Sequence, residues 1–194
     1  MLNKLLQKYN IILGSVSPRR KELLSDIGIK FSIHTTDKKE KYPSTLKEEK
    51  IAEFLAQQKS KLLSENQKVK DLLITADTIV SYKDKVLNKP KDKKQAFDTL
   101  KKLSGNTHKV ITGVCIKSIN KEVTFSVISM VTFKELSHKE IEYYINNFNP
   151  FDKAGAYGIQ DWIGKIGIQK IDGSYSNVVG LPTKELYEQL KLFI

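Results

Sequence analysis

The segment that decides the fold class lies near the start of the chain, where residues 11–28 read IILGSVSPRRKELLSDIG. Its apolar start, Ile11 to Gly14, predicts a short buried strand. Ser17 followed by Pro18 is the pattern of a helix N-cap with proline at the first helical position, and Gly28 marks the expected end of the helix. The segment therefore predicts a strand, a loop and a helix, which is the repeating unit of an α/β fold.

Strand and helix signals alternate along the rest of the chain. Apolar, β-branched runs predict strands, and capping boxes such as Thr45-Leu-Lys-Glu48 and Ser137-His-Lys-Glu140 predict helix starts. The expected further strands are Lys30–Thr35, Leu72–Tyr82, Lys109–Ile119, Glu122–Phe133 and Ile166–Ile171. The expected further helices begin near Thr45, Asp92, Ser137 and Lys184. This order predicts one α/β domain over residues 1–194, with a mixed twisted sheet and flanking helices.

The composition limits the class of protein. Apolar residues make up 40% of the 194 residues, which is enough to bury one substantial core. No run approaches the roughly 20 apolar residues that span a bilayer, and Met1–Asn10 lacks the apolar core of a signal peptide. Cys115 is the only cysteine, which excludes an internal disulfide and a Cys-rich metal site. We therefore expect a soluble protein of the cytoplasm.

The formal net charge of +11 comes mainly from lysines distributed from end to end. Such a field attracts any polyanion, whether a nucleotide, RNA or a membrane surface. A lysine-rich proteome would give the same composition without any such ligand. The charge is therefore compatible with a phosphorylated ligand but does not identify one.

A first candidate site is the loop and helical turn that begin at Ser15. Three cations, Arg19, Arg20 and Lys21, fall in the first turn of the expected helix. Each cation there opposes the helix macrodipole by roughly 0.3 to 1 kcal/mol, whereas a bound phosphate would meet free backbone N–H groups and guanidinium groups together. Ser15 and Ser17 would add hydroxyl donors. A solvated basic turn with Ser17 as a simple cap is the alternative, and it stays open because exposed cations cost little.

A second candidate is a carboxylate inside an apolar strand. Asp77 and the hydroxyl side chains of Thr75 and Thr78 interrupt the run Leu72–Val80. A buried carboxylate must shift its pKa, accept several hydrogen bonds or bind a cation, and such a carboxylate is what water activation requires. A structural role, in which Asp77 begins a turn or accepts backbone hydrogen bonds, explains the pattern equally well.

Two lysines also interrupt structured segments. Lys59 shares a helical stripe with Ile51 and Leu55, so it falls on the face expected to be buried and would reach into a cleft. A lysine that snorkels from an apolar stripe is the commoner case, however. Lys89 precedes Pro90 on a connection of restricted shape, which is a weak signal by itself.

The segment Asp152–Gln160 combines two glycines, an aromatic residue, a charge pair and an amide. Glycines let a backbone approach a ligand closely, and Gln160 carries the donor and acceptor needed to read a base edge. A structural turn with Tyr157 packed inside is equally consistent with the pattern. With Cys115 as the lone thiol and no nucleophile elbow around Ser174, covalent catalysis is not indicated.

Taken together, these segments resemble the Maf family of nucleotide pyrophosphatases, with the matching motifs in order along nearly the whole chain. The motifs are Ser15–Arg20 with Glu22–Leu24, Ala76–Thr78, Lys89-Pro90, Leu103–Gly105 with His108, Thr112-Gly113, Asp152–Gln160, and Gly173–Tyr175 with Val179–Pro182. The resemblance implies a two-lobed α/β fold similar to inosine triphosphate pyrophosphatases, with a central cleft between the lobes. It also implies hydrolysis of a nucleoside triphosphate to the monophosphate and pyrophosphate. The Asp152–Gln160 loop is similar to the branch that acts on dTTP and UTP.

The resemblance also implies a role for individual residues. Asp77 matches the general base, and Asp77 with Glu40 is the expected ligand pair for a divalent cation, Mg²⁺ or Mn²⁺. The sequence does not decide whether Asp77 serves as the base or as the metal ligand. The specificity positions are matched by Arg19, Thr78 and Gln160, and further substrate-binding positions by Ser15, Ser17, Arg20, Lys59, Lys89 and Lys153. Two departures concern this site: Gly14 stands where the family usually has alanine, and Lys39 stands where it often has an acidic residue beside Glu40.

Other functions stay open from the sequence. One alternative is a non-catalytic regulatory protein that binds a nucleotide or RNA, and another is a pyrophosphatase for a modified purine nucleotide such as 7-methyl-GTP. We expect a small-molecule nucleoside triphosphate as the partner, with no membrane and no specific nucleic acid. The sequence does not decide whether the chain forms a homodimer, or whether it serves nucleotide housecleaning or division arrest.

Overall fold

The computed structural model describes residues 2–35 and 41–194. These residues belong to two compact units. Unit 1 consists of Met1–Asp77, Thr112–Val127 and Gly180–Ile194, and unit 2 consists of Thr78–Ile111 and Ile128–Val179. The chain therefore enters unit 2 twice and returns to unit 1 each time. In the ranges described, no helix is long and apolar enough to cross a membrane.

The strands form a seven-stranded sheet with the order β2-β1-β3-β5-β6-β7, in which β4 pairs with β3. β1 runs parallel to β2 and β3, whereas the β3–β4 and β6–β7 pairs are antiparallel. The bounds are β1 Asn10–Leu13, β2 Ser32–Ile33, β3 Asp71–Tyr82, β4 Lys85–Leu87, β5 Thr107–Lys117, β6 Glu122–Phe133 and β7 Ile168–Asp172. This mixed sheet with flanking helices confirms the predicted α/β class.

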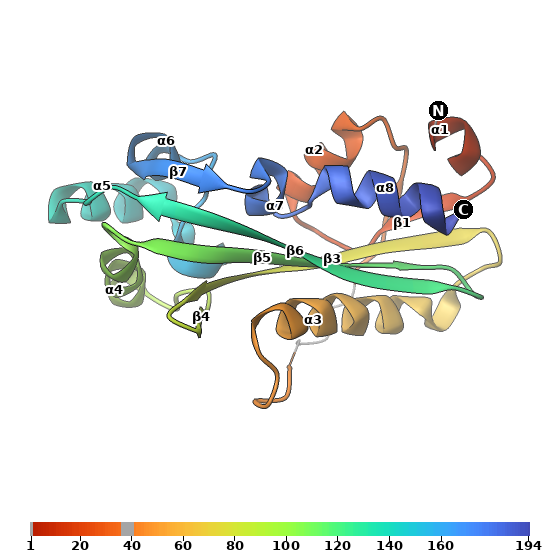
Figure 1. The fold of residues 1–194 in the computed structure, drawn as a ribbon, viewed down its shortest axis with the longest axis horizontal. Coiled ribbons are helices and arrows are strands. Elements are labelled where there is room, and N and C mark those ends of the chain that lie inside the picture. Colours follow the sequence, from red (N-terminus) through yellow and green to blue (C-terminus); the bar gives the residue numbers. More distant parts are fainter. Residues whose placement is uncertain (1, 36–40) are drawn as a thin grey trace. The chain divides into compact units, whose positions relative to one another are not determined.

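In unit 1, the side chains of β3 alternate between its two faces, and both faces are covered. Leu72 and Ile74 pack into an apolar core with helices α1, α2 and α8. Thr75 points the other way and donates a 2.7 Å hydrogen bond from Oγ1 to Ala56 O of α3. Figure 1 shows α3 on one face of these strands and α2 with α8 on the other. The helices are α1 Leu2–Leu6, α2 Pro18–Asp26, α3 Glu48–Leu63 and α8 Thr183–Phe193.

Unit 2 has its own apolar core, which is built around β6 and two amphipathic helices. Leu100 of α4 and Ile141 of α5 are fully buried against Val131 and Phe133 of β6. Two short helices and two 3-10 turns complete the unit. The elements are α4 Lys93–Leu103, α5 His138–Phe148, the turns η2 Pro150–Asp152 and η3 Ala154–Ala156, α6 Trp162–Gly167 and α7 Tyr175–Val179.

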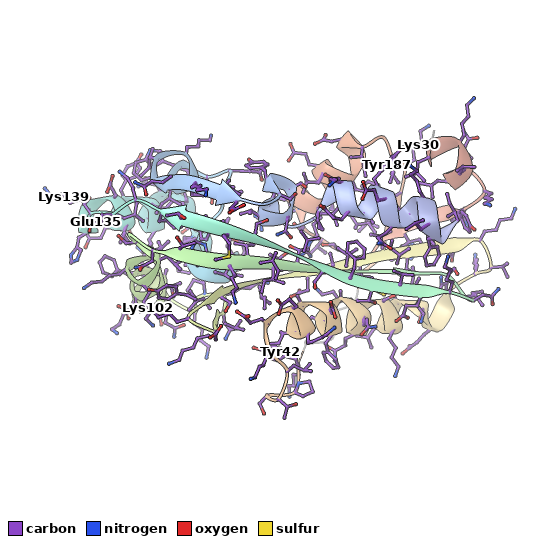
Figure 2. The ribbon with its side chains drawn as sticks, viewed as in Figure 1. Lys30, Tyr42, Lys102, Glu135, Lys139 and Tyr187 are labelled. Atoms are coloured by element: carbon purple, nitrogen blue, oxygen red, sulfur yellow. The ribbon has the colours of Figure 1, made fainter. Side chains whose placement is uncertain are left out.

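The caps of three helices follow the sequence prediction. Ser17 caps α2 with Pro18 at the first helical position, and Asp92 caps α4 by accepting the Gln95 N–H at 2.7 Å. Ser137 forms the predicted capping box at the start of α5. The lysines extend over the exposed surface of each unit, as Lys30 of unit 1 and Lys102 and Lys139 of unit 2 illustrate (Figure 2).

Three local predictions were wrong. The capping box at Thr45 does not form, because Pro43 O accepts the Leu46 N–H at 3.1 Å and closes a turn there, so that α3 begins only at Glu48. The strand expected at Lys30–Thr35 is reduced to the two residues of β2. The strand expected from Ile166 begins at Ile168, because the preceding residues belong to α6.

Candidate active site

Two predicted site segments lie on neighbouring parallel strands of the sheet in unit 1. β1 and β3 are parallel, with Leu13 beside Ile74, and the Gly14 N–H continues the ladder to Ile74 O at 2.8 Å. Beyond this point β1 ends in the Ser15 loop, while β3 continues to Asp77. Ligands of parallel sheets bind beyond the carboxyl ends of the strands, where backbone loops and side chains are available.

Gly14 brings the loop close to the neighbouring strand. A Cβ atom there would lie 2.5 Å from Thr75 Cγ2 and 2.6 Å from Leu63 Cδ1. Both obstructing atoms are side-chain ends, which can shift more easily than backbone. A side chain at this position would therefore require Thr75 and Leu63 to shift.

The loop Ser15–Ser17 is held by hydrogen bonds within unit 1. Ser15 is buried, and its Oγ accepts the Ser17 N–H at 3.3 Å and Arg20 Nη1 at 3.3 Å. Ser17 Oγ accepts the Arg20 N–H at 3.5 Å as the cap of α2. Arg20 Nε donates to Gly180 O at 2.7 Å, so this guanidinium joins the loop to the segment before α8. Arg19 lies half-buried in the same helical turn.

Lys59 and Asp77 form a half-buried ion pair. Lys59 Nζ lies 2.6 Å from Asp77 Oδ1 and donates a second bond to Ala76 O at 3.1 Å. The two side chains are only 14% and 16% exposed. Lys59 thus reaches inward from α3 to the carboxylate instead of snorkelling to solvent, and Asp77 is oriented by a cation instead of beginning a turn.

In unit 2, the predicted Asp152–Gln160 loop is compact and strained. Gly155 and Ala156 have φ of 69° and 60°, and a Cβ at Gly155 would lie 2.9 Å from Val80 Cγ1. Lys153 Nζ lies 2.7 Å from Asp152 Oδ1. Gln160 is half-buried, and its amide makes no hydrogen bond with residues 2–35 or 41–194. An amide without a hydrogen bond in the described ranges is available to bind a ligand.

Tyr157 packs inside the loop against His108. His108 Nε2 and Tyr157 Oη are 2.7 Å apart, and both side chains are buried. Burial lowers the pKa of His108 to about 4 and raises that of Tyr157 above its usual range, so both stay neutral near pH 7. Of the two alternatives for the loop, a packed Tyr157 describes this side chain, and the sequence pattern did not identify His108 as its partner.

The remaining predicted residues are dispersed. Thr78 follows Asp77 on β3 but belongs to unit 2. Lys89 is exposed after β4, and in the part of the chain that is described it has no ion pair. Glu40 lies outside the described residues, as does Lys39.

A protein family model described as Maf-like protein matches residues 10–193. The chain belongs to the Maf-like protein family. A dTTP/UTP pyrophosphatase of Phocaeicola vulgatus is 51% identical over 187 residues, which cover 96% of this chain and 97% of that relative. A dTTP/UTP pyrophosphatase of Flavobacterium johnsoniae is 45% identical over 194 residues, which cover all of both chains.

A dTTP/UTP pyrophosphatase of Porphyromonas gingivalis is 49% identical to this Maf-like chain over 191 residues, 97% of the chain and 96% of the relative. A solved nucleoside-triphosphatase / dITP/XTP pyrophosphatase of Mycobacterium abscessus matches with a TM-score of 0.42 at 12% identity, over 64% of this chain and 74% of that one. That structural likeness is too weak to carry an argument. The family itself is shown by the sequence match over almost the entire chain.

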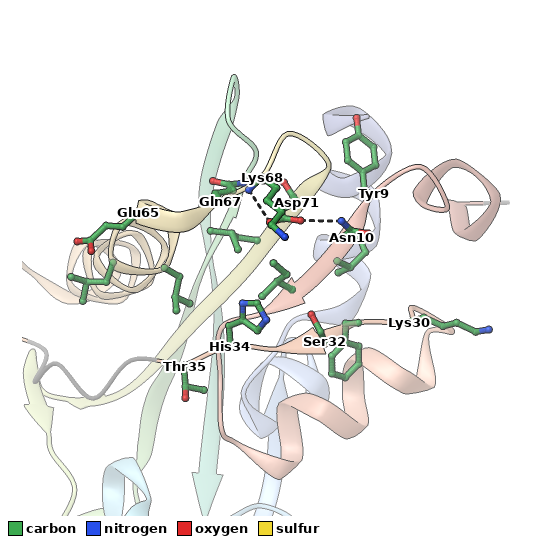
Figure 3. Close-up of a pocket in the computed structure, with 16 residues that line it drawn as sticks. Tyr9, Asn10, Lys30, Ser32, His34, Thr35, Glu65, Gln67, Lys68 and Asp71 are labelled. Atoms are coloured by element: carbon green, nitrogen blue, oxygen red, sulfur yellow. Dashed lines mark hydrogen bonds between the residues drawn. The ribbon is translucent and has the colours of Figure 1, made fainter.

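A groove of about 1000 Å³ lies elsewhere in unit 1 of this Maf-like protein, beside β1, β2 and the end of α3 (Figure 3). Its buried acid, Asp71, is already bonded: Oδ1 accepts Asn10 Nδ2 at 3.1 Å, and Oδ2 accepts the Lys68 N–H at 2.9 Å. His34 lies at its exposed rim. None of the predicted site residues that the structure describes lines the groove, so it is separate from the Ser15 loop and the Lys59–Asp77 pair.

Proposed function

We propose that this Maf-like protein is a nucleoside triphosphate pyrophosphatase that converts dTTP and UTP to the monophosphate and pyrophosphate. The observation that carries the proposal is the 2.6 Å contact between Lys59 and Asp77. Asp77 lies on β3, and the Ser15 loop follows the end of the neighbouring parallel strand β1. The full-length similarity to relatives named dTTP/UTP pyrophosphatase supports the substrate class.

In this proposal the Ser15–Ser17 loop and the start of α2 bind phosphate oxygens. The first N–H groups of a helix and two serine hydroxyls are suited to an anion. Arg20 holds the loop through Ser15 Oγ and Gly180 O, and Arg19 adds positive charge to the same turn. Lys89 is further assigned to the substrate phosphates, and Lys153 to substrate binding.

A divalent cation, Mg²⁺ or Mn²⁺, fits the donors that are present. Asp77 Oδ1 is engaged by Lys59, but Oδ2 has no hydrogen bond within the described ranges. Mg²⁺ takes one or two carboxylates and completes its shell with phosphate oxygens and water, so a group of three protein ligands, which the described residues do not contain, is not required. Asp77 and Glu40 would hold the ion, which supplies neutralisation of the triphosphate charge.

Asp77 is assigned to the water that attacks the α-phosphorus. As the new P–O bond forms, the bond from the α-phosphorus to the bridging oxygen breaks, and pyrophosphate leaves. Asp77 has one of two roles, which Asp77→Asn does not separate: it accepts the water proton, or it ligates the cation, and Lys59 Nζ fixes its orientation in either case. Positioning and charge neutralisation provide most of the rate in such a reaction.

We assign recognition of the base to Gln160, with Thr78 and Arg19 as further specificity positions. The Gln160 amide offers one acceptor and two donors, and no residue of the described ranges occupies them. Thymine and uracil present a carbonyl and a ring N–H that match such an amide. We also place the protein in the cytoplasm, because a buried free thiol at Cys115 suits a reducing compartment.

The products of UTP and dTTP turnover test the reaction type. Monophosphate and pyrophosphate are expected, whereas diphosphate with orthophosphate would reject the proposal. Metal-independent binding without released pyrophosphate would indicate a regulatory protein instead. A panel that adds 7-methyl-GTP and ITP, run with metal and with chelator, identifies the substrate class.

Asp77→Asn tests the assigned centre of the reaction. We expect kcat to fall on the order of 10²-fold or more, because the amide can neither take the proton nor bind a cation strongly. Near wild-type turnover by the folded variant would refute the assignment. Its thermal midpoint serves as the folding control.

A further inference from the structure

A buried network closes the Asp152–Gln160 loop from both ends. Tyr144 of α5 is fully buried, and its Oη donates to Asp161 Oδ2 at 2.6 Å while it accepts the Gly158 N–H at 3.1 Å. Asp161 Oδ2 also lies 3.7 Å from Lys153 Nζ. One carboxylate at the end of the loop therefore contacts a buried hydroxyl and an ammonium at the start of the loop.

Asp161 does not serve the helix that it precedes. It occupies the N-cap position of α6, where an aspartate normally accepts a backbone N–H of the first turn, yet no such bond is present. Its carboxylate is directed at Tyr144 and Lys153 instead. The local helix thus goes without a side-chain cap, while the carboxylate holds the loop.

Neighbouring features support this use of Asp161. Gly158 permits the contact, because a Cβ there would lie 2.6 Å from Asp161 Oδ2. Lys153 is only 12% exposed and is held between Asp152 and Asp161. Burial, and then the Asp161 carboxylate, raise the pKa of Tyr144 above its usual range, so its hydroxyl stays a donor.

Gln160 lies directly before this carboxylate and directly after the buried Ile159. Its two neighbours are therefore fixed, while its own amide is unengaged in the described ranges. The loop leaves Gln160 as the polar group whose hydrogen bonds are still to be made.

We propose that Asp161, through Tyr144 and Lys153, is a positioning residue that orients Gln160 and thereby sets the preference for pyrimidine nucleotides. This inference rests on the proposed function. Asp161 itself does not contact the substrate. It affects which nucleotide is accepted more than it affects the rate of the chemical step.

The primary test compares kcat/KM for UTP and for GTP in wild type, Asp161→Ala and Asp161→Asn. In Asp161→Ala the UTP/GTP ratio is expected to fall about tenfold, through a higher KM for UTP with a smaller change in kcat, as for the loss of a binding contact worth about 1.4 kcal/mol. Asp161→Asn keeps an acceptor for Tyr144 and should recover part of the ratio. Tyr144→Phe should lower the ratio as well.

A matched control separates positioning from loss of stability. Asp92 is also an N-cap aspartate of unit 2, but it caps its own helix through Gln95 N. Asp92→Ala should lower the thermal midpoint and leave the UTP/GTP ratio unchanged. An equal change of the ratio in Asp92→Ala and Asp161→Ala would overturn the proposal.

A double-mutant cycle with Gln160→Ala tests the route. If Asp161 acts through Gln160, then Asp161→Ala changes the ratio little further in the Gln160→Ala background. Additive effects, or an unchanged ratio in folded Asp161→Ala and Tyr144→Phe, overturn the proposal while wild-type turnover of UTP upholds the proposed function. Failure of wild type to hydrolyse either dTTP or UTP would reject the proposed function and this inference with it.

Discussion

At the scale of single residues, the ion pair of Lys59 and Asp77 is the most informative contact. The two residues are 18 positions apart in sequence and belong to a helix and a strand, so the pattern of either element alone does not pair them. The apolar stripe showed only that Lys59 was misplaced for a solvent-facing lysine. The structure gives the reason, because its ammonium fixes one oxygen of the carboxylate.

Lys59→Met removes this cation while keeping a long side chain. We expect kcat with UTP to fall at least about tenfold, because Asp77 loses the donor that orients it. Lys61→Met is the matched control, since Lys61 is exposed two residues further along the same helix. Equal activities of the two variants would contradict the role of Lys59.

His108 makes the stability of the protein depend on pH. Its pKa is about 4 in the folded chain against an ordinary 6.5, because burial disfavours the charged ring. Between these values the unfolded chain binds a proton that the folded chain does not, so the free energy of unfolding rises with pH through this window. The contribution is fully present above about pH 6.5 and is lost as the pH falls towards 4.

Urea unfolding at about pH 7.5 and about pH 5 measures this dependence. Wild type should lose about 2 kcal/mol more than His108→Gln on acidification, since glutamine keeps a hydrogen-bonding partner for Tyr157 but does not titrate. Parallel losses in the two proteins would show that His108 is not the responsible group.

At the scale of elements, the close approach of β5 to α3 depends on one glycine. A Cβ at Gly113 would lie 2.3 Å from the backbone C and O atoms of Ala52. Backbone cannot move aside as a side chain does, so Gly113→Ala should destabilise unit 1 by about 3 kcal/mol. Thermal or urea unfolding measures this loss.

Gly14→Ala is the comparison for that variant. Its Cβ would meet the ends of two side chains, Thr75 and Leu63, at 2.5 and 2.6 Å. We expect a smaller loss of stability than for Gly113→Ala. The reverse order would show that β5 and α3 can separate more readily than their contact suggests.

Elements with strong local signals were predictable, whereas short ones were not. Asp92 and Ser137 marked helix starts correctly because each makes its hydrogen bond within four residues of itself. Helix α6 was missed because its short sequence contains two glycines, Gly164 and Gly167, which disfavour helix in isolation. It forms because Ile163 is buried in the core of unit 2.

For the predicted site, sequence order named the segments but not their contacts. Arg20 was predicted to bind substrate, and its bond to Gly180 O joins residues 160 positions apart. Neither the Tyr144–Asp161 bond nor the distance of Lys153 from Asp161 follows from spacing. Such contacts depend on how the chain packs within each unit, which the periodicity of apolar residues does not describe.

At the scale of the whole molecule, the net charge of +11 predicts a salt dependence. A nucleoside triphosphate is a polyanion, so a positively charged protein attracts it, and salt screens the attraction. We expect KM for UTP to rise about threefold between about 50 and about 500 mM NaCl, with less change in kcat. Steady-state kinetics at constant free Mg²⁺ measure this effect.

A KM that is independent of salt would show that only contacts close to the substrate matter. Potassium glutamate in place of NaCl is a useful control, because it distinguishes general screening from competition by chloride. Under general screening, the two salts should raise KM to a similar extent at equal ionic strength.

The interleaving of the units has a consequence for how the protein is made. All of unit 2 lies between Thr78 and Val179, so a ribosome has synthesised it before it begins Gly180–Ile194. That last segment supplies α8, whose Leu186 and Leu190 are fully buried in the core of unit 1. The core of unit 1 therefore needs residues that are translated after the whole of unit 2. Asp77 is translated early, yet the core of the unit that contains it is complete only after Gly180–Ile194 has been made.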